Sequence, residues 1–186
     1  NIESVSITYQ GKIYKTQPVI SDTRMQLYLN TPVLAKGDKI NIKINYSFII
    51  PAYGSDRMGR MMNKNGIIYE IAQWYPRMCV YDDVEGWNTL PYMGLGEFYC
   101  DYGNYDYYIT APSEMIIYGS GDLQNAEQVL TTEEIKRLAE ASKSDKTVTI
   151  IGAGEAGKSS TRQAGKANLT WHFSMKNTRD VAFAAG

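Results

Sequence analysis

Alternation of apolar and polar residues is the feature that most limits how this chain can fold. From Ile40 to Phe48 every second residue is apolar or aromatic, and Val5, Ile7 and Tyr9 repeat the pattern. A period of two places one face of a strand on a core and the other toward solvent or a partner. About ten such runs, with only one helical segment, predict an all-β fold, a large antiparallel sheet or sandwich.

The runs are separated by turn and loop signals. Lys36-Gly37-Asp38 and Asn65-Gly66 are typical of turns, and residues 52–66 and 82–96 are predicted to be irregular. Strands are predicted over residues 5–9, 13–14, 25–29, 40–48, 67–73, 105–112, 115–118, 147–151, 169–175 and 181–183.

One segment has helical character. Thr131 and Glu134 fit a capping box ahead of apolar residues at helical spacing, which predicts one short surface helix near residues 131–143. No linker divides the chain, so we expect residues 1–186 to form a single β domain.

Net charge, apolar runs and cysteine content limit the classes of function that this chain can have. The net charge of −1 provides no electrostatic footprint for nucleic acid, and no apolar run approaches the roughly 20 residues that span a bilayer. Cys79 and Cys100 are compatible with a disulfide in an oxidising compartment or with two buried free thiols. We favour a periplasmic or extracellular location over a cytoplasmic one.

The segment Gly152–Ser159 matches a phosphate-binding loop, G-x-x-x-x-G-K-[ST]. That chemistry needs a helix directly afterwards, because helical N–H groups hold the phosphates. Residues 160–168 contain no large apolar side chain that such a helix could bury. We therefore predict a flexible loop over about 152–168 and keep nucleotide binding at 152–159 as a remote alternative.

Other chemical groups are sparse. His172 is the only histidine, so an H-E-x-x-H zinc site cannot form within this chain, and its place on an alternating strand favours an exposed or partly buried strand histidine. Asp82, Asp83 and Glu85 could hold a calcium ion, but such clusters are more often solvated loops. We expect no catalytic residue and no metal ligand in this chain.

Several ordered motifs resemble one family. Gln73-Trp74-Tyr75-Pro76-Arg77-Met78, followed by Tyr81-Asp82-Asp83 and Gly86-Trp87-Asn88, is similar to the amino-terminal domain of aminopeptidase N-like zinc metallopeptidases, and to a divergent bacterial branch of them. Arg77 follows Pro76 here, whereas common members carry an Arg before the aromatic-Pro step. Later segments that share the resemblance are Phe98-Tyr99, residues 107–112, residues 119–123, residues 171–173 and residues 179–185.

The resemblance implies a saddle-like, non-catalytic β domain that covers the cleft of its own catalytic domain and helps hold the amino end of a peptide substrate. Glu70 and Gln73 are the substrate-binding candidates that it implies, and ordinary polar strand residues are the alternative reading. Zinc would belong to the catalytic domain, so this chain alone should be inactive. We expect the reading frame to continue past Gly186 into a segment with H-E-x-x-H.

A different class of function remains open. A free-standing module that binds carbohydrate, or another ligand that stacks on aromatic rings, is the main alternative. Because of the alternation, only some of these rings can face outward. The candidate rings are Trp74, Trp87, Tyr99, Tyr102, Tyr105, Tyr107 and Tyr108.

Overall fold

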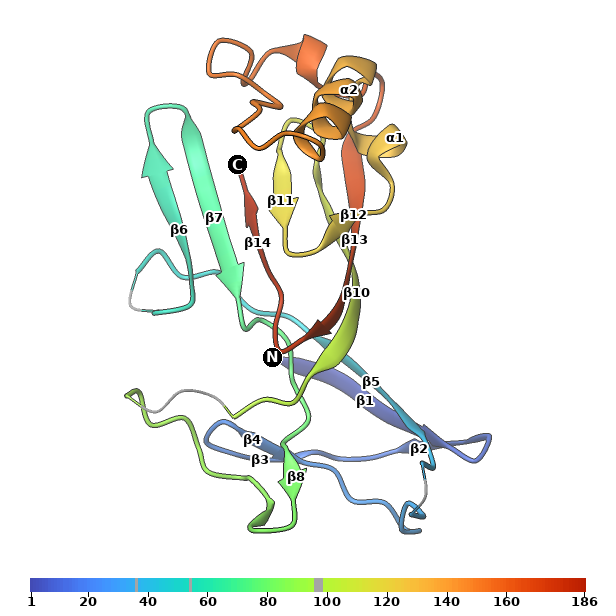
Figure 1. The fold of residues 1–186 in the computed structure, drawn as a ribbon. Helices are drawn as coiled ribbons and strands as arrows, with labels where there is room; N and C mark the ends of the chain where they lie inside the picture. The colour runs from blue at the N-terminus through green and yellow to red at the C-terminus, as the bar shows by residue number, and fades with distance from the viewer. Residues whose placement is uncertain (36, 54, 96–98) are drawn as a thin grey trace. The chain divides into compact units, whose positions relative to one another are not determined.

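The computed structural model describes residues 1–35, 37–53, 55–95 and 99–186, and antiparallel strands dominate it (Figure 1). This confirms the predicted all-β fold class. The chain divides into two compact units, unit 1 with residues 1–49 and 78–99 and unit 2 with residues 50–77 and 100–186. A single domain over residues 1–186 stays a prediction.

Unit 1 contains a three-stranded sheet with the order β2–β1–β5. The alternation in β1 and β5 sets its register, because Val5 lies opposite Ile44 and Ile7 lies opposite Ile42. Val5, Ile7 and Tyr9 are buried, so this face of β1 forms the core of unit 1. The strands are β1 (Ile2–Tyr9), β2 (Lys12–Lys15) and β5 (Ile40–Tyr46).

Two short hairpins complete unit 1. They are β3 (Val19–Ser21) with β4 (Arg24–Gln26), and β8 (Tyr81–Asp82) with β9 (Gly86–Trp87). The buried Tyr9 hydroxyl donates to the carboxylate of Asp38 at 2.7 Å. Lys36, part of the predicted turn beside Asp38, lies outside the described residues, as do Glu97 and Phe98.

Unit 2 has two antiparallel sheets. The first has the order β11–β14–β7–β6 and the second the order β10–β13–β12. Figure 1 shows the long pair β10 and β13 beside the shorter strands β11 and β14. The strands are β6 (Met58–Asn63), β7 (Gly66–Ala72), β10 (Gly103–Pro112), β11 (Ile117–Gly119), β12 (Asp122–Leu123), β13 (Asn168–Thr178) and β14 (Ala182–Ala185).

The core of unit 2 comes from the alternating residues of β13. Leu169, Trp171 and Phe173 are buried on one face, as the sequence predicts, and they pack with Ile117 of β11 and Ala185 of β14. The core therefore connects the two sheets. At about 25 cal/mol per Å² of apolar area, burying each of these large side chains contributes roughly 1.5–3 kcal/mol.

Two α-helices and one 3₁₀ helix are present in the described residues. The predicted helix is α2 (Thr132–Ala141), and the Thr131–Glu134 capping box is formed. The short α1 (Ala126–Val129) and the 3₁₀ helix η1 (Ser159–Thr161) were not predicted. No helix in the described ranges is long and apolar enough to cross a membrane.

Several predicted segments need correction, and residues 82–96, predicted to be irregular, contain β9 and the last residue of β8. Residues 147–151 form no strand, and the predicted strand over 25–29 reaches only Gln26. The predicted loop over 52–66 contains β6, which pairs with β7 through a turn at residues 64–65, one position before the predicted Asn65-Gly66 turn. An Asn-Gly signal is typical of a hairpin, and it was the sequence signal that could have indicated β6.

Candidate functional site

One row of residues crosses the first sheet of unit 2 and carries a single carboxylate. Glu70 on β7 lies opposite Gly59 on β6 and Ala184 on β14, and Ala184 lies opposite Tyr118 on β11. Directly opposed residues project from the same face of an antiparallel sheet. Glu70 is exposed, with a glycine on one side and an alanine on the other.

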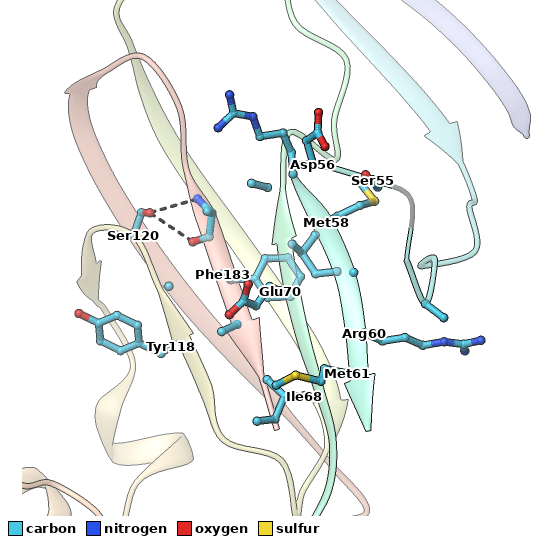
Figure 2. Close-up of a pocket in the computed structure, with 18 of the residues that line it drawn as sticks. Ser55, Asp56, Met58, Arg60, Met61, Ile68, Glu70, Tyr118, Ser120 and Phe183 are labelled. Carbon is cyan, nitrogen blue, oxygen red and sulfur yellow. Dashed lines mark hydrogen bonds between the residues drawn. The ribbon is translucent and has the colours of Figure 1, made fainter. Parts of the chain in front are cut away.

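Glu70 and both small neighbours line an open pocket of about 900 Å³, and Figure 2 shows Glu70 near its middle. Tyr118, 81% exposed, comes from the β11 side of the pocket. Met61, 62% exposed, comes from β6 and lies opposite Ile68. Glu70 thus lies between the exposed ring of Tyr118 and the exposed side chain of Met61.

Two further charged residues that line the pocket, Arg60 and Asp56, lie apart from Glu70. Figure 2 shows Arg60 pointing away from Glu70, while Asp56 lies at another end of the pocket. The register explains the direction of Arg60, since it pairs with Tyr69 and so projects from the opposite face to Glu70. Ser120 is committed to the fold, because its hydroxyl donates to the carbonyl of Ala182 and accepts from the Ala182 amide.

Gln73, the second substrate-binding candidate, does not line this pocket. It follows the end of β7 with a left-handed backbone, at a φ of 54°. Its side chain is half-buried. The structure therefore places Glu70, but not Gln73, in the pocket.

The aromatic segment after Gln73 is architectural. Trp74 packs edge-on against Tyr75, Tyr107 and Phe183, at ring-centroid distances of 4.8, 5.9 and 5.1 Å. Burial of Tyr107 is the main reason that its pKa is raised to about 12. These rings fasten the segment to β10 and β14.

An ion pair fixes the same segment to the start of β14. The Tyr75 hydroxyl donates to Asp180 at 2.6 Å, and Arg77 lies 3.2 Å from the other carboxylate oxygen. Burial, followed by the bond to Asp180, raises the pKa of Tyr75. The Arg that follows Pro76 thus supports the fold here.

Asp82, the first residue of the acidic cluster in unit 1, caps a turn. Asp82 accepts from the amides of Val84 and Glu85 and from the side chain of Asn88. The Glu85 amide and then Asn88 lower the pKa of Asp82. No group of three or more His, Cys, Asp or Glu side chains that could hold a metal ion occurs in the part of the chain that the structure describes.

The remaining aromatic candidates fall into two groups. Tyr105 and Tyr107 share the inward face of β10, whereas Tyr108 is exposed on the other face, as predicted. Tyr108 stacks on His172 at 4.1 Å between ring centroids, and His172 Nε2 lies 2.8 Å from Asp106. In unit 1, Trp87 is exposed and packs edge-on against Tyr81.

Both cysteines are free thiols, and neither is buried, since Cys79 is exposed and Cys100 is partly exposed. The alternative with two buried thiols is therefore wrong.

The glycine-rich segment is irregular, as predicted, and no α-helix follows it in the described residues. Only the short η1 begins at Ser159. Its flexibility stays a prediction.

Comparison with known proteins gives no match: no family model, curated protein or solved structure is similar to this chain. The site is therefore interpreted from its own geometry. The resemblance implied Glu70 as a candidate, but the sequence did not indicate its neighbours Gly59, Tyr118 and Ala184, because only strand pairing brings these residues together.

Proposed function

We propose that this chain is the non-catalytic β domain of a zinc aminopeptidase-like metallopeptidase, and that Glu70 receives the free amino group of a peptide. The observation that supports this most is the position of Glu70, exposed between Gly59 and Ala184 in the pocket of unit 2. A carboxylate binds an ammonium group by charge-assisted hydrogen bonds, and the small neighbours leave that carboxylate accessible.

The partner in this proposal is the protein's own catalytic domain, which would supply zinc and the hydrolytic groups. The proposal assigns this chain no metal and no bond-breaking step. Its part in the reaction is to position the peptide. Glu70 would hold the amino end, while the rim formed by Tyr118 and Met61 would contact the peptide's side chains.

An activity assay of this chain tests the non-catalytic assignment directly. The purified chain, supplied with zinc and an aminoacyl chromogenic substrate, should give no turnover. Sustained turnover that persists after repurification would contradict the non-catalytic assignment.

Binding at Glu70 is tested by titrating the labelled chain with a short peptide and following its NMR chemical shifts. Shifts should concentrate at Glu70, Gly59 and Ala184, with a dissociation constant on the order of millimolar. An exposed ion pair contributes about 1 kcal/mol at most, so Glu70→Gln should weaken binding measurably but no more than about fivefold.

Glu127→Gln is the matched control, because Glu127 is an exposed residue of α1 outside the pocket. It should leave the affinity unchanged. Equal affinity for the wild-type chain and the Glu70→Gln variant would refute the role of Glu70.

Carbohydrate binding is the second candidate, and the exposed stack of Tyr108 on His172 favours it. An open aromatic face beside a carboxylate such as Asp106 suits a sugar ring. A glycan panel should then give specific binding that Tyr108→Ala abolishes. Binding that survives this substitution, or no binding at all, would remove this candidate.

A further inference from the structure

The glycine-rich segment Gly152–Ser159 closes around a carboxylate of its own. Two guanidinium nitrogens of Arg137 donate to the two carboxylate oxygens of Glu155, at 2.7 and 3.0 Å. The backbone amide of Gly152 adds a third bond of 2.9 Å. Fork-to-fork pairing of this kind is the geometry by which arginine holds carboxylates and phosphates.

The amides of this segment are also engaged within it. The N–H groups of Glu155 and Ala156 donate to the carbonyl of Gly152, and that of Lys158 donates to the carbonyl of Glu155. In a phosphate-binding loop such amides would point at the ligand. Here they close turns of the chain, and the anion in the loop is Glu155.

The charges around Glu155 favour its ionised form. Arg137 projects from α2 and is steadied by the carbonyl of Ile150 and by Glu133, while Lys158 contributes a further positive charge. The bonds from Arg137 and then from Gly152 lower the pKa of Glu155 to about 2. The carboxylate therefore stays ionised through the pH range in which an ordinary glutamate takes up a proton.

Further contacts bind the following residues to the same region. Gln163 donates to the carbonyl of Leu130, and Arg162 donates to the carbonyl of Glu114 at 2.9 Å. The pair between Arg137 and Glu155 is the only one of these attachments in which both partners are charged side chains.

We propose that Arg137 and the Gly152 amide form an anion cradle that the chain fills with Glu155, and that this clasp fastens the segment 150–163 to α2. The G-x-x-x-x-G-K-[ST] pattern thus marks a self-occupied cradle, closed to an external phosphate while Glu155 is in place. This inference is independent of the proposed peptide binding, because none of its residues lines the pocket around Glu70.

Amide hydrogen exchange of the intact chain tests the clasp. Glu155→Ala should speed exchange in residues 150–163 about tenfold, because the segment loses its charge-assisted hydrogen bonds to Arg137 of α2. Glu155→Gln, which keeps the side-chain volume, should do the same. Glu140→Ala, at an exposed position of α2, is the control and should leave the segment unchanged.

Chemical rescue distinguishes two explanations of faster exchange in Glu155→Ala, an empty anion cradle and a general weakening of the loop. Formate, compared with chloride at equal ionic strength, should restore slow exchange in Glu155→Ala and should have no effect when Arg137→Ala is added. Inorganic phosphate and Mg-ATP should not change exchange or melting of the wild-type chain.

Three results would overturn the proposal. They are unchanged exchange in both Glu155 variants, failure of formate to restore protection in Glu155→Ala, and a thermal shift of the wild-type chain with Mg-ATP that Lys158→Ala abolishes. The last result would instead support a nucleotide site.

Discussion

Gly121 gives the most quantitative test of how unit 2 is packed. It has a left-handed backbone, at a φ of 89°, in the turn before β12. A methyl group at this position would lie 2.7 Å from the Cβ of Met175 and closer still to the carbonyl oxygen of Ser174. Both atoms belong to β13, whose backbone is held by its ladder with β10 and cannot easily move.

Two other glycines separate the cost of backbone strain from the cost of overpacking. Gly165 is also left-handed, at 77°, but an added methyl group would meet nothing within 4 Å. Gly154 has neither a left-handed backbone nor a close neighbour. Gly165→Ala therefore measures the cost of backbone strain without overpacking. Gly154→Ala has neither cost and is the reference.

The expected costs follow from these differences. Gly154→Ala should be neutral or stabilising by up to about 1 kcal/mol, because alanine restricts the unfolded chain. Gly165→Ala should cost about 1 kcal/mol of left-handed strain. Gly121→Ala should add overpacking of about 1–3 kcal/mol, for a total of roughly 2–4 kcal/mol.

Urea unfolding followed by tryptophan fluorescence measures these values. The series is best made in a Trp87→Phe background, because Trp87 belongs to unit 1 whereas Trp74 and Trp171 report on unit 2. If Gly121→Ala costs no more than Gly165→Ala, the close packing of this turn on β13 is wrong.

Three further predictions concern other contacts of unit 2. Phe173→Ala should cost about 3–5 kcal/mol in urea unfolding, because the ring is buried and stacks on Tyr107; a loss below 1 kcal/mol would contradict the core assignment. Thr131→Ala should cost about 1 kcal/mol by removing the helix cap, whereas Thr132→Ala, at the exposed next residue, should change stability by less than about 0.5 kcal/mol; equal effects would argue against the cap. Because the pKa of Glu155 is lowered from 4.5 to about 2, its stabilising contribution is complete above pH 4.5 and is lost as the pH falls toward 2; the stability gap between the wild-type chain and Glu155→Gln should therefore close over this range, and a gap that stays constant would refute the linkage.

Local patterning explains how much of the fold the sequence could predict. The alternation of Leu169, Trp171 and Phe173 predicts both β13 and its buried face, and the Thr131–Glu134 box predicts the start of α2. The apolar run 147–151 forms no strand, because apolar periodicity alone does not provide a pairing partner. β6 was missed because its glycine, arginine and methionines break the alternation, although β7 pairs with it.

The candidate site depends more than these fold elements do on pairing between strands that are far apart in the sequence. Glu70 was predicted from the resemblance, but its neighbours Gly59 and Ala184 come from strands far apart in the chain. The role of Glu155 was equally hidden, because its partner Arg137 lies on a helix 18 residues earlier. The role of Asp82, by contrast, follows from nearby sequence, because an Asp close to a glycine is typical of a turn. In the structure Asp82 accepts from the amide of Glu85 in the turn between β8 and β9.

The most direct test of the proposed function compares one short peptide with its N-acetylated twin. The two differ only in the charged amino group that Glu70 is proposed to receive. Titrated into the wild-type chain, the free peptide should bind several-fold more tightly than the acetylated peptide, and Glu70→Gln should abolish that difference. Equal binding of the two peptides by the wild-type chain, or a preference that persists in Glu70→Gln, would contradict the account.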